Sequence, residues 1–136
     1  MRRRMRNKMQ YISMQDIPKL KIKLQQKKEI FMVEIDGKQC IHLIDYLNEM
    51  SERLQFPIRA KGLDGYNDWM RDLSWIKARR IVILISNYRD FLREDILSKE
   101  AVIEDFNQLI LPWWECEANE FVTDGEMKEM TIYIAS

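Results

Sequence analysis

A continuous apolar run, RIVILIS, occupies residues 80–86 between charged or polar residues on both sides. Most of its residues are β-branched, and such side chains pack well on the pleated surface of a sheet. Because polar residues do not alternate with the apolar ones, the pattern is typical of a strand that is covered on both faces, as in a parallel sheet. The sequence therefore predicts that residues 80–86 form the central strand of the fold or a strand close to it.

Two further strands are predicted, one on each side of this run along the sequence. The segment IFMVEI (30–35) is rich in β-forming residues and ends at the turn signal Asp36-Gly37, and MTIYIA (130–135) lies near the C-terminus. Apolar residues at helical spacing predict helices between these strands. The helical segments are 43–54, 63–76, 88–97 and 98–111, the last with Ser98 as its N-cap.

The order of these elements is strand, two helices, strand, two helices, strand. Such alternation favours parallel strands that are joined by right-handed helical crossovers. We therefore predict an α/β fold with a small three-stranded parallel sheet packed with helices. A chain of 136 residues is long enough for one such domain with one sizeable core.

The zero net charge of the chain hides an uneven distribution. Residues 1–28 contain ten of the 22 basic residues and one of the 22 acidic residues, so residues 29–136 carry a net charge of −9. We therefore divide the chain into a basic N-terminal extension, 1–28, and a domain, 29–136. The composition of the extension favours a poorly ordered tail, and contact with RNA stays open as its alternative role. The acidic domain repels nucleic acid and attracts basic proteins.

No segment resembles a membrane anchor or an export signal. The longest apolar runs are far shorter than the roughly 20 residues that cross a bilayer, and no apolar stretch follows the charged start of the sequence. We expect a cytoplasmic protein that does not bind a membrane. In that setting Cys40 and Cys116 are expected to be free, reduced thiols.

The segment LDGYNDWMRDLSWI (63–76) carries acids at every fourth position, Asp64, Asp68 and Asp72. Residues four apart lie on one face of a helix, so these carboxylates should form a row. Like charges at this spacing are mildly unfavourable in an isolated helix, and they become favourable opposite basic side chains. Three interpretations stay open: a partner-binding surface, a solvated helix face and a Mg²⁺-dependent enzyme site.

The other residues of the chain give little support to the enzyme. His42 is the only histidine, and it lies at the predicted start of a helix, where capping is the expected role. The sequence contains no glycine-rich phosphate loop, no Ser-His-Asp set and no Cys-His cluster to accompany the acids. We therefore expect no catalytic residues, no cofactor and no metal site.

The region FPIRAKGLDGYNDWMRDLSWI (56–76) resembles the signature region of the barstar family, whose members carry a Leu-Asp-x-x-x-Asp core, commonly followed by Leu-Ser-Trp. Leu63, Asp64 and Asp68 match the core, and residues 73–75 match the sequel. The order of predicted elements from about residue 30 to residue 136 is also similar to that of the family. Residues 1–28 have no counterpart in it.

This resemblance implies an intracellular immunity protein that inhibits a barnase-type ribonuclease, a basic extracellular or toxin-type protein made by the same cell. In the family, the second helix and the loop before it plug the nuclease active site, with aspartates where substrate phosphates bind. The resemblance thus implies a set of partner-binding residues. They are Asp64 and Asp68, with Gly62, Leu63, Gly65 and Asn67 shaping the contact and Glu100 as a peripheral acid. The alternative is a barstar-like module that binds another protein or RNA through residues 1–28.

Three features depart from the family pattern or stand outside it. The loop before the acidic helix contains Arg59 and Lys61 instead of aromatic residues with Gly and Asn, and these charges would oppose a basic partner. Asn67 stands where a large aromatic residue precedes the second aspartate in the best-known member of the family. We therefore expect the target to differ at its rim. Elsewhere, the adjacent Trp113 and Trp114 cannot both face the core if the chain is regular there.

Overall fold

The strand predicted at residues 80–86 lies inside a parallel sheet of four strands. The computed structural model of the chain describes residues 8–115 and 128–136. Its strands have the order β1-β4-β3-β2 across the sheet, and all neighbouring pairs are parallel. The strands are β1 (Lys8–Ile12), β2 (Ile30–Asp36), β3 (Arg80–Ser86) and β4 (Glu129–Ala135). The predicted α/β class and the inner position of β3 are confirmed.

The number of strands was predicted wrongly, because the sheet has four strands and not three. The additional strand, β1, comes from the segment that was assigned to the basic extension. It pairs with β4 in the register Lys8↔Thr131 to Ile12↔Ala135 and so covers the free edge of β4. An edge strand tolerates a lysine and polar residues on its exposed side. The composition of residues 8–12 therefore did not indicate a strand, although it is compatible with one. The division of the chain at residue 28 stays a prediction.

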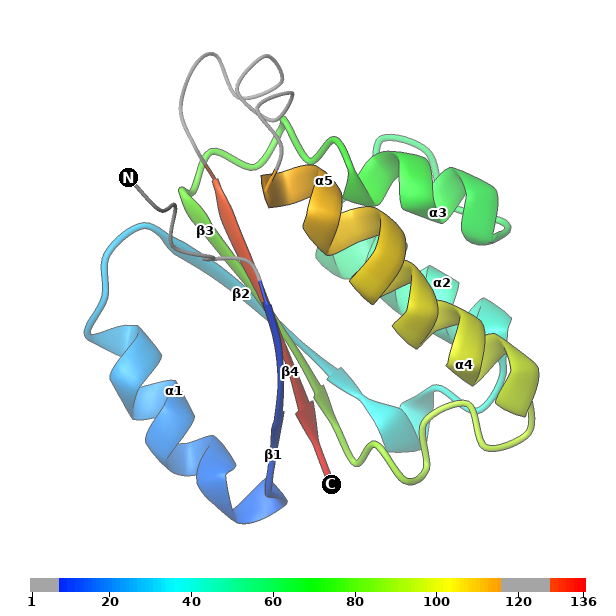
Figure 1. The fold of residues 1–136 in the computed structure, drawn as a ribbon, viewed down its shortest axis with the longest axis horizontal. Helices are drawn as coiled ribbons and strands as arrows, with labels where there is room; N and C mark the ends of the chain where they lie inside the picture. Colours follow the sequence, from blue (N-terminus) through cyan, green and yellow to red (C-terminus); the bar gives the residue numbers. More distant parts are fainter. Residues whose placement is uncertain (1–7, 116–127) are drawn as a thin grey trace.

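A helix, α1 (Ile17–Gln25), follows β1 and leads to β2. It begins after a short 3-10 turn that Ser13 and Asp16 stabilise as a capping box: the Ser13 hydroxyl accepts from the Gln15 amide, and the Asp16 carboxylate accepts from the Ser13 amide. In Figure 1, α1 lies on one side of the sheet and the other labelled helices lie on the opposite side. Residues 8–25 therefore add a strand and a helix to the predicted fold.

The second helical layer contains α2 (Leu43–Arg53), α3 (Leu63–Met70), α4 (Ile96–Asp105) and α5 (Leu111–Glu115). A π-helical segment, Phe106–Ile110, joins α4 to α5. The helix predicted at 88–97 is wrong: residues 88–94 form turns, with Leu92 at a positive φ of 51°. The N-cap predicted at Ser98 is also wrong, because the Asp95 side chain accepts from the Ser98 amide and starts α4 earlier.

The main core fills the space between the sheet and this helical layer. Its largest fully buried side chains are aromatic: Trp114, Tyr46, Tyr66, Phe91 and Phe106. The Tyr46 and Tyr66 hydroxyls share a buried hydrogen bond of 2.5 Å that joins α2 to α3. Burial of these polar groups is tolerated because each hydroxyl has a partner. The core therefore fixes α3 from behind and leaves its other side at the surface.

Only one of the two predicted free cysteines lies in the described part of the chain. Cys40 is buried without a disulfide, and burial raises the pKa of its thiol to about 12. The group is therefore a neutral, unreactive thiol at physiological pH. Cys116 lies outside the described residues. Among the described residues, no helix combines the length and the apolar character that a bilayer crossing requires.

The predicted turn after β2 depends on a glycine. A Cβ at position 37 would overlap the backbone carbonyl oxygen of Asn87 and would lie 2.8 Å from that of Ser86. We expect Gly37→Ala to lower the free energy of unfolding by about 1–3 kcal/mol, the usual cost of overpacking a dense interior. Urea unfolding followed by circular dichroism measures this change. A variant as stable as the natural protein would show that the contact between β2 and the segment after β3 is loose.

Candidate partner-binding surface

The helix α3 has one buried side and one exposed side. Tyr66, Asn67 and Met70 are buried, whereas Asp64 and Asp68 are exposed. The indole nitrogen of Trp114 donates to the Met70 carbonyl oxygen at 2.9 Å, which fixes the C-terminal end of the helix. Side chains four residues apart on a helix are neighbours, with roughly 5–6 Å between their Cβ atoms. The structure thus places the two carboxylates together at the surface of α3.

An arginine of the chain partly neutralises this acidic pair. Arg71 Nη2 lies 2.9 Å from Asp68 Oδ1, and Arg71 Nε donates to the Asn67 carbonyl oxygen at 3.1 Å. Asp68 nevertheless keeps a side-chain exposure of 74%. Among the described residues, Asp64 makes no ion pair. Because exposed ion pairs contribute only about 0–1 kcal/mol, a stronger cation from a partner can replace Arg71 at Asp68.

The acidic row is a pair, because Asp72 does not continue it. The helix ends at Met70, and Leu73 has a positive φ of 50°. Asp72 Oδ1 accepts a hydrogen bond from the Ser74 amide at 3.1 Å and so stabilises the turn after the helix. The expected third member of the row therefore has a local structural role.

The uncharged candidate residues fall into two groups. Gly62 and Gly65 face open space, with nothing within 4 Å of a Cβ added at either position. Leu63 is half-buried and packs against the main core. Asn67 points inward: it is 7% exposed, and its Nδ2 donates to Asp105 Oδ2 at 2.9 Å. Direct contact with a partner fits the glycines, whereas Asn67 ties α3 to the end of α4.

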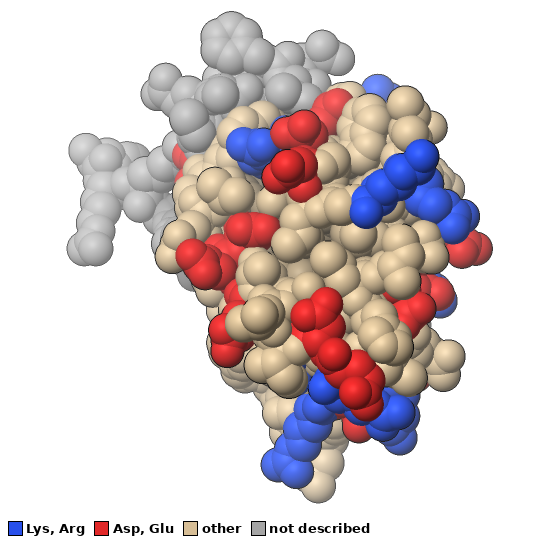
Figure 2. Space-filling model, turned by 90° about the vertical axis from the view of Figure 1, so that its right-hand side faces the viewer, with Lys and Arg blue, Asp and Glu red and all other residues tan. Residues whose placement is uncertain are grey.

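The remaining candidate, Glu100, lies on the exposed side of α4. Glu100 is five residues before Asp105, so it lies about 7.5 Å from the Asn67–Asp105 hydrogen bond, toward the N-terminal end of α4. A shallow hollow of about 750 Å³ runs beside it, with Tyr88, Ile103 and Glu104 among its lining residues. Figure 2 shows this side of the molecule, with several groups of acidic side chains on it and basic ones mostly near its margins.

The basic loop before α3 is partly attached to the body of the protein. Arg59 Nη1 donates to Asn48 Oδ1 of α2 at 3.1 Å, whereas Lys61 is exposed. Ile58, in the same loop, is 69% exposed. The loop therefore places apolar and positively charged groups beside the acidic pair. A partner surface that fits both would need more than a simple excess of positive charge.

The described residues were compared with the requirements of a metal site and of a helix cap at His42. No group of three or more His, Cys, Asp or Glu side chains in this part of the chain is placed to hold a metal ion. His42 is the N-cap residue of α2, and its backbone amide donates to Asp45 Oδ2 at 2.9 Å.

The comparison with protein families identifies the family of the chain. A family model described as Barstar (barnase inhibitor) matches residues 30–131, well over half of the chain. The chain belongs to the Barstar family. Proteins of this family are inhibitors rather than enzymes. Neither the curated proteins nor the solved structures that were compared with the chain gave a significant match. The Barstar match begins at β2, so β1 and α1 lie outside the matched range.

Proposed function

We propose that this Barstar-family chain is an intracellular inhibitor of a barnase-type ribonuclease, an immunity protein that occludes the nuclease active site with α3. In this mechanism Asp68 and Asp64 occupy the subsites of substrate phosphates, and the loop 58–62 and Leu63 cover the rim of the cleft. The observation that carries the proposal is the exposed acidic pair on α3 with Gly65 between its two members. No metal, cofactor or bond-breaking step takes part.

The two glycines support a surface that a partner approaches closely. Gly65 lies inside α3, where glycine costs about 1 kcal/mol relative to alanine. Neither a positive φ nor a close neighbour requires glycine at position 65 or at Gly62, the N-cap of α3. Exposed backbone without a side chain is useful where another chain must lie directly against the helix. The exposed backbone at the two glycines and the two carboxylates together give α3 a negatively charged surface that another chain can approach closely.

The charge of the domain supports a basic partner. Residues 29–136 carry a net charge of −9. A field of this sign attracts a positively charged nuclease and raises the rate of encounter at low salt. Glu100, outside the centre of the contact, belongs to this long-range field. Asn67 acts indirectly, because its bond to Asp105 sets the position of α3.

The direct experiment is a titration of a purified barnase-type ribonuclease with the full chain, with cleavage of a fluorescent RNA as the readout. We expect inhibition that saturates at equal amounts of the two proteins. In the same assay, Gly65→Ala should weaken inhibition about tenfold, or ~1.4 kcal/mol, because the added methyl lies between α3 and the nuclease.

A stability measurement separates this effect from misfolding. Gly65→Ala should raise the free energy of unfolding by about 0.5–1 kcal/mol, because alanine is the better helix former and the site is open. A variant that is more stable and inhibits less well would support direct contact at α3. If inhibition is unchanged while stability rises, α3 does not lie against the nuclease, and the proposed site is refuted.

A further inference from the structure

The face of the sheet that is remote from α3 and α4 is only partly covered. On this side α1 buries Ile17 and Leu24, and Ile17 forms a small apolar cluster with Leu84 and Ala135. Toward the N-terminal ends of the strands the covering stops. There a hollow of about 510 Å³ lies between α1 and the sheet, within the range of small-ligand pockets.

Strand alternation explains the residues that line this hollow. Side chains two apart on a strand share a face, and paired strands continue the same row. Lys8 and Gln10 of β1 are paired with Thr131 and Tyr133 of β4, and Thr131 is paired in turn with Val82 of β3. All five line the hollow. Its floor therefore offers an amide, a hydroxyl and a phenol ring between positively charged walls.

The positive charge of the hollow is only partly compensated. Its basic side chains are Lys8, Lys23, Lys27 and Arg80, and its one acid is Glu129. Glu129 Oε2 lies 3.3 Å from Arg80 Nε, whereas the three lysines have no ion-pair partner among the described residues. A second hollow of about 330 Å³ shares Lys27, Arg80 and Glu129 with the first. It adds Lys28, Arg79 and Glu29.

We propose that these two adjoining hollows, here called the basic groove, bind single-stranded RNA. The lysines and arginines contact consecutive phosphates, Tyr133 stacks on a base, and Gln10 and Thr131 hydrogen-bond to base edges or to ribose. Proteins that bind single strands combine a basic track for the backbone with an aromatic surface for the bases. Tyr133 is half-buried, and burial raises its pKa, so its ring is neutral at physiological pH.

The basic groove is separate from the proposed inhibitor surface. Figure 1 shows α1 on one side of the sheet, with α3 and α4 on the other. The sheet thus separates the acidic side chains of α3 and α4 from the basic groove, where Glu29 and Glu129 are the acids among the lining residues. The sequence left open a role in RNA contact for residues 1–28. The groove contains residues of this segment together with Arg80 and residues of β3 and β4.

The test measures the binding of a fluorescein-labelled oligouridylate of about 12 nucleotides to the full chain by fluorescence anisotropy, a length within the usual site sizes. With one phosphate contact for each of the six basic residues of the groove, the logarithm of the association constant should fall against the logarithm of salt concentration with a slope of about −4. The groove variant reverses three charges in the groove. It carries Lys8→Glu, Lys23→Glu and Lys27→Glu, and we expect it to bind at least about tenfold more weakly, with a slope near −2 from the three remaining contacts.

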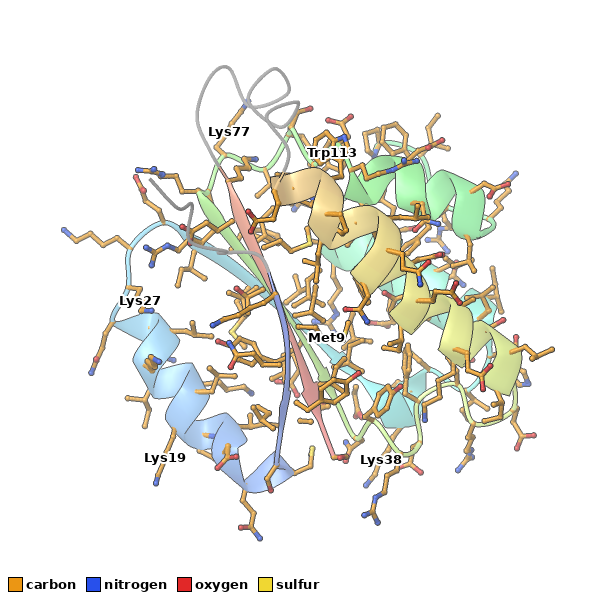
Figure 3. The ribbon with its side chains drawn as sticks, viewed as in Figure 1. Met9, Lys19, Lys27, Lys38, Lys77 and Trp113 are labelled. Atoms are coloured by element: carbon orange, nitrogen blue, oxygen red, sulfur yellow. The ribbon has the colours of Figure 1, made fainter. Side chains whose placement is uncertain are left out.

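A matched control carries the same change in net charge at exposed lysines elsewhere. It combines Lys19→Glu, Lys38→Glu and Lys77→Glu, and none of these residues lines the groove. In Figure 3, Lys19 is labelled on α1, Lys38 beside the turn after β2, and Lys77 before β3. The figure also labels Lys27 of the groove, which lies past the end of α1. We expect the control to bind RNA within about threefold of the natural protein, because screened charges outside the contact contribute little.

Two further measurements distinguish RNA from an acidic protein segment. Tyr133→Leu should weaken RNA binding about tenfold, whereas Tyr133→Phe should keep it, because stacking requires the ring and not the hydroxyl. An oligoglutamate of equal charge should compete poorly. The proposal is overturned if the natural protein fails to bind RNA at low salt, if the control loses as much affinity as the groove variant, or if oligoglutamate competes as well as RNA. Nuclease inhibition by the groove variant should stay unchanged.

Discussion

Replacement of Asp68 by asparagine is expected to weaken nuclease binding by about 2–5 kcal/mol, roughly 30-fold to several thousand-fold. This is the cost of truncating a hydrogen-bonded charge pair that is buried in an interface, a range to which barnase–barstar complexes themselves contributed. Asparagine keeps the shape of the side chain, so the loss reports the charge. Surface plasmon resonance should show the change mainly in the dissociation rate, because short-range contacts act after the two proteins have met.

Asp68→Asn should leave the free energy of unfolding of the free chain almost unchanged. In the free chain Asp68 is 74% exposed, and within residues 8–115 and 128–136 its ion-pair partner is Arg71 alone, at 2.9 Å. An exposed ion pair of this kind contributes about 0–1 kcal/mol to folding. The large effect on binding and the small effect on unfolding together would mark Asp68 as a residue that serves the partner rather than the fold.

Glu100 provides the control for the first prediction. It is exposed on α4, outside the proposed centre of the contact. Glu100→Gln should cost less than about 1 kcal/mol of affinity, and its effect should shrink as salt screens the remaining charges. If Asp64→Ala and Asp68→Ala both leave nuclease affinity unchanged, the assignment of the acidic pair is wrong, whatever the family of the chain.

The elements that could be predicted from the sequence are those with a strong local pattern. The apolar run 80–86 predicted a strand of a parallel sheet, because a continuous β-branched run of this length is typical of a strand covered on both faces. The stripe that begins at Leu43 identified α2, which the structure ends at Arg53. The four-residue spacing of Asp64 and Asp68 predicts that both acids lie on one side of a short helix, as they do on α3.

The features that were missed depend on contacts between distant parts of the chain. β1 is a strand only because β4, about 120 residues later, offers a free edge, and the lysines around it resemble those of a tail. The sequence predicts Asn67 as a contact residue of the acidic helix, yet its side-chain amide donates a hydrogen bond to Asp105, 38 residues away. No local pattern encodes either pairing. The basic groove was missed for the same reason, since β1, α1, β3 and β4 all contribute to it.

Trp114→Ala is the substitution expected to destabilise the fold most. The side chain is fully buried, and its indole nitrogen donates to the Met70 carbonyl oxygen at 2.9 Å. Truncation of a buried tryptophan costs about 3–5 kcal/mol. A domain of this size has a total stability of only about 5–15 kcal/mol, so the variant should be close to unfolding at physiological temperature. Urea unfolding at low temperature measures the loss.

Trp114→Phe and Trp113→Ala separate the causes of this loss. Phenylalanine retains most of the packing but leaves the Met70 carbonyl without its donor, which should cost about 1–3 kcal/mol. Trp113 is half-buried and stands edge-on to Trp114 at 5.0 Å, so its truncation should cost less than that of Trp114. Equal losses for Trp113→Ala and Trp114→Ala would contradict the central position of Trp114. Because Met70 ends the helix that carries Asp68, Trp114→Phe should also weaken nuclease binding, whereas Trp113→Ala should affect binding less.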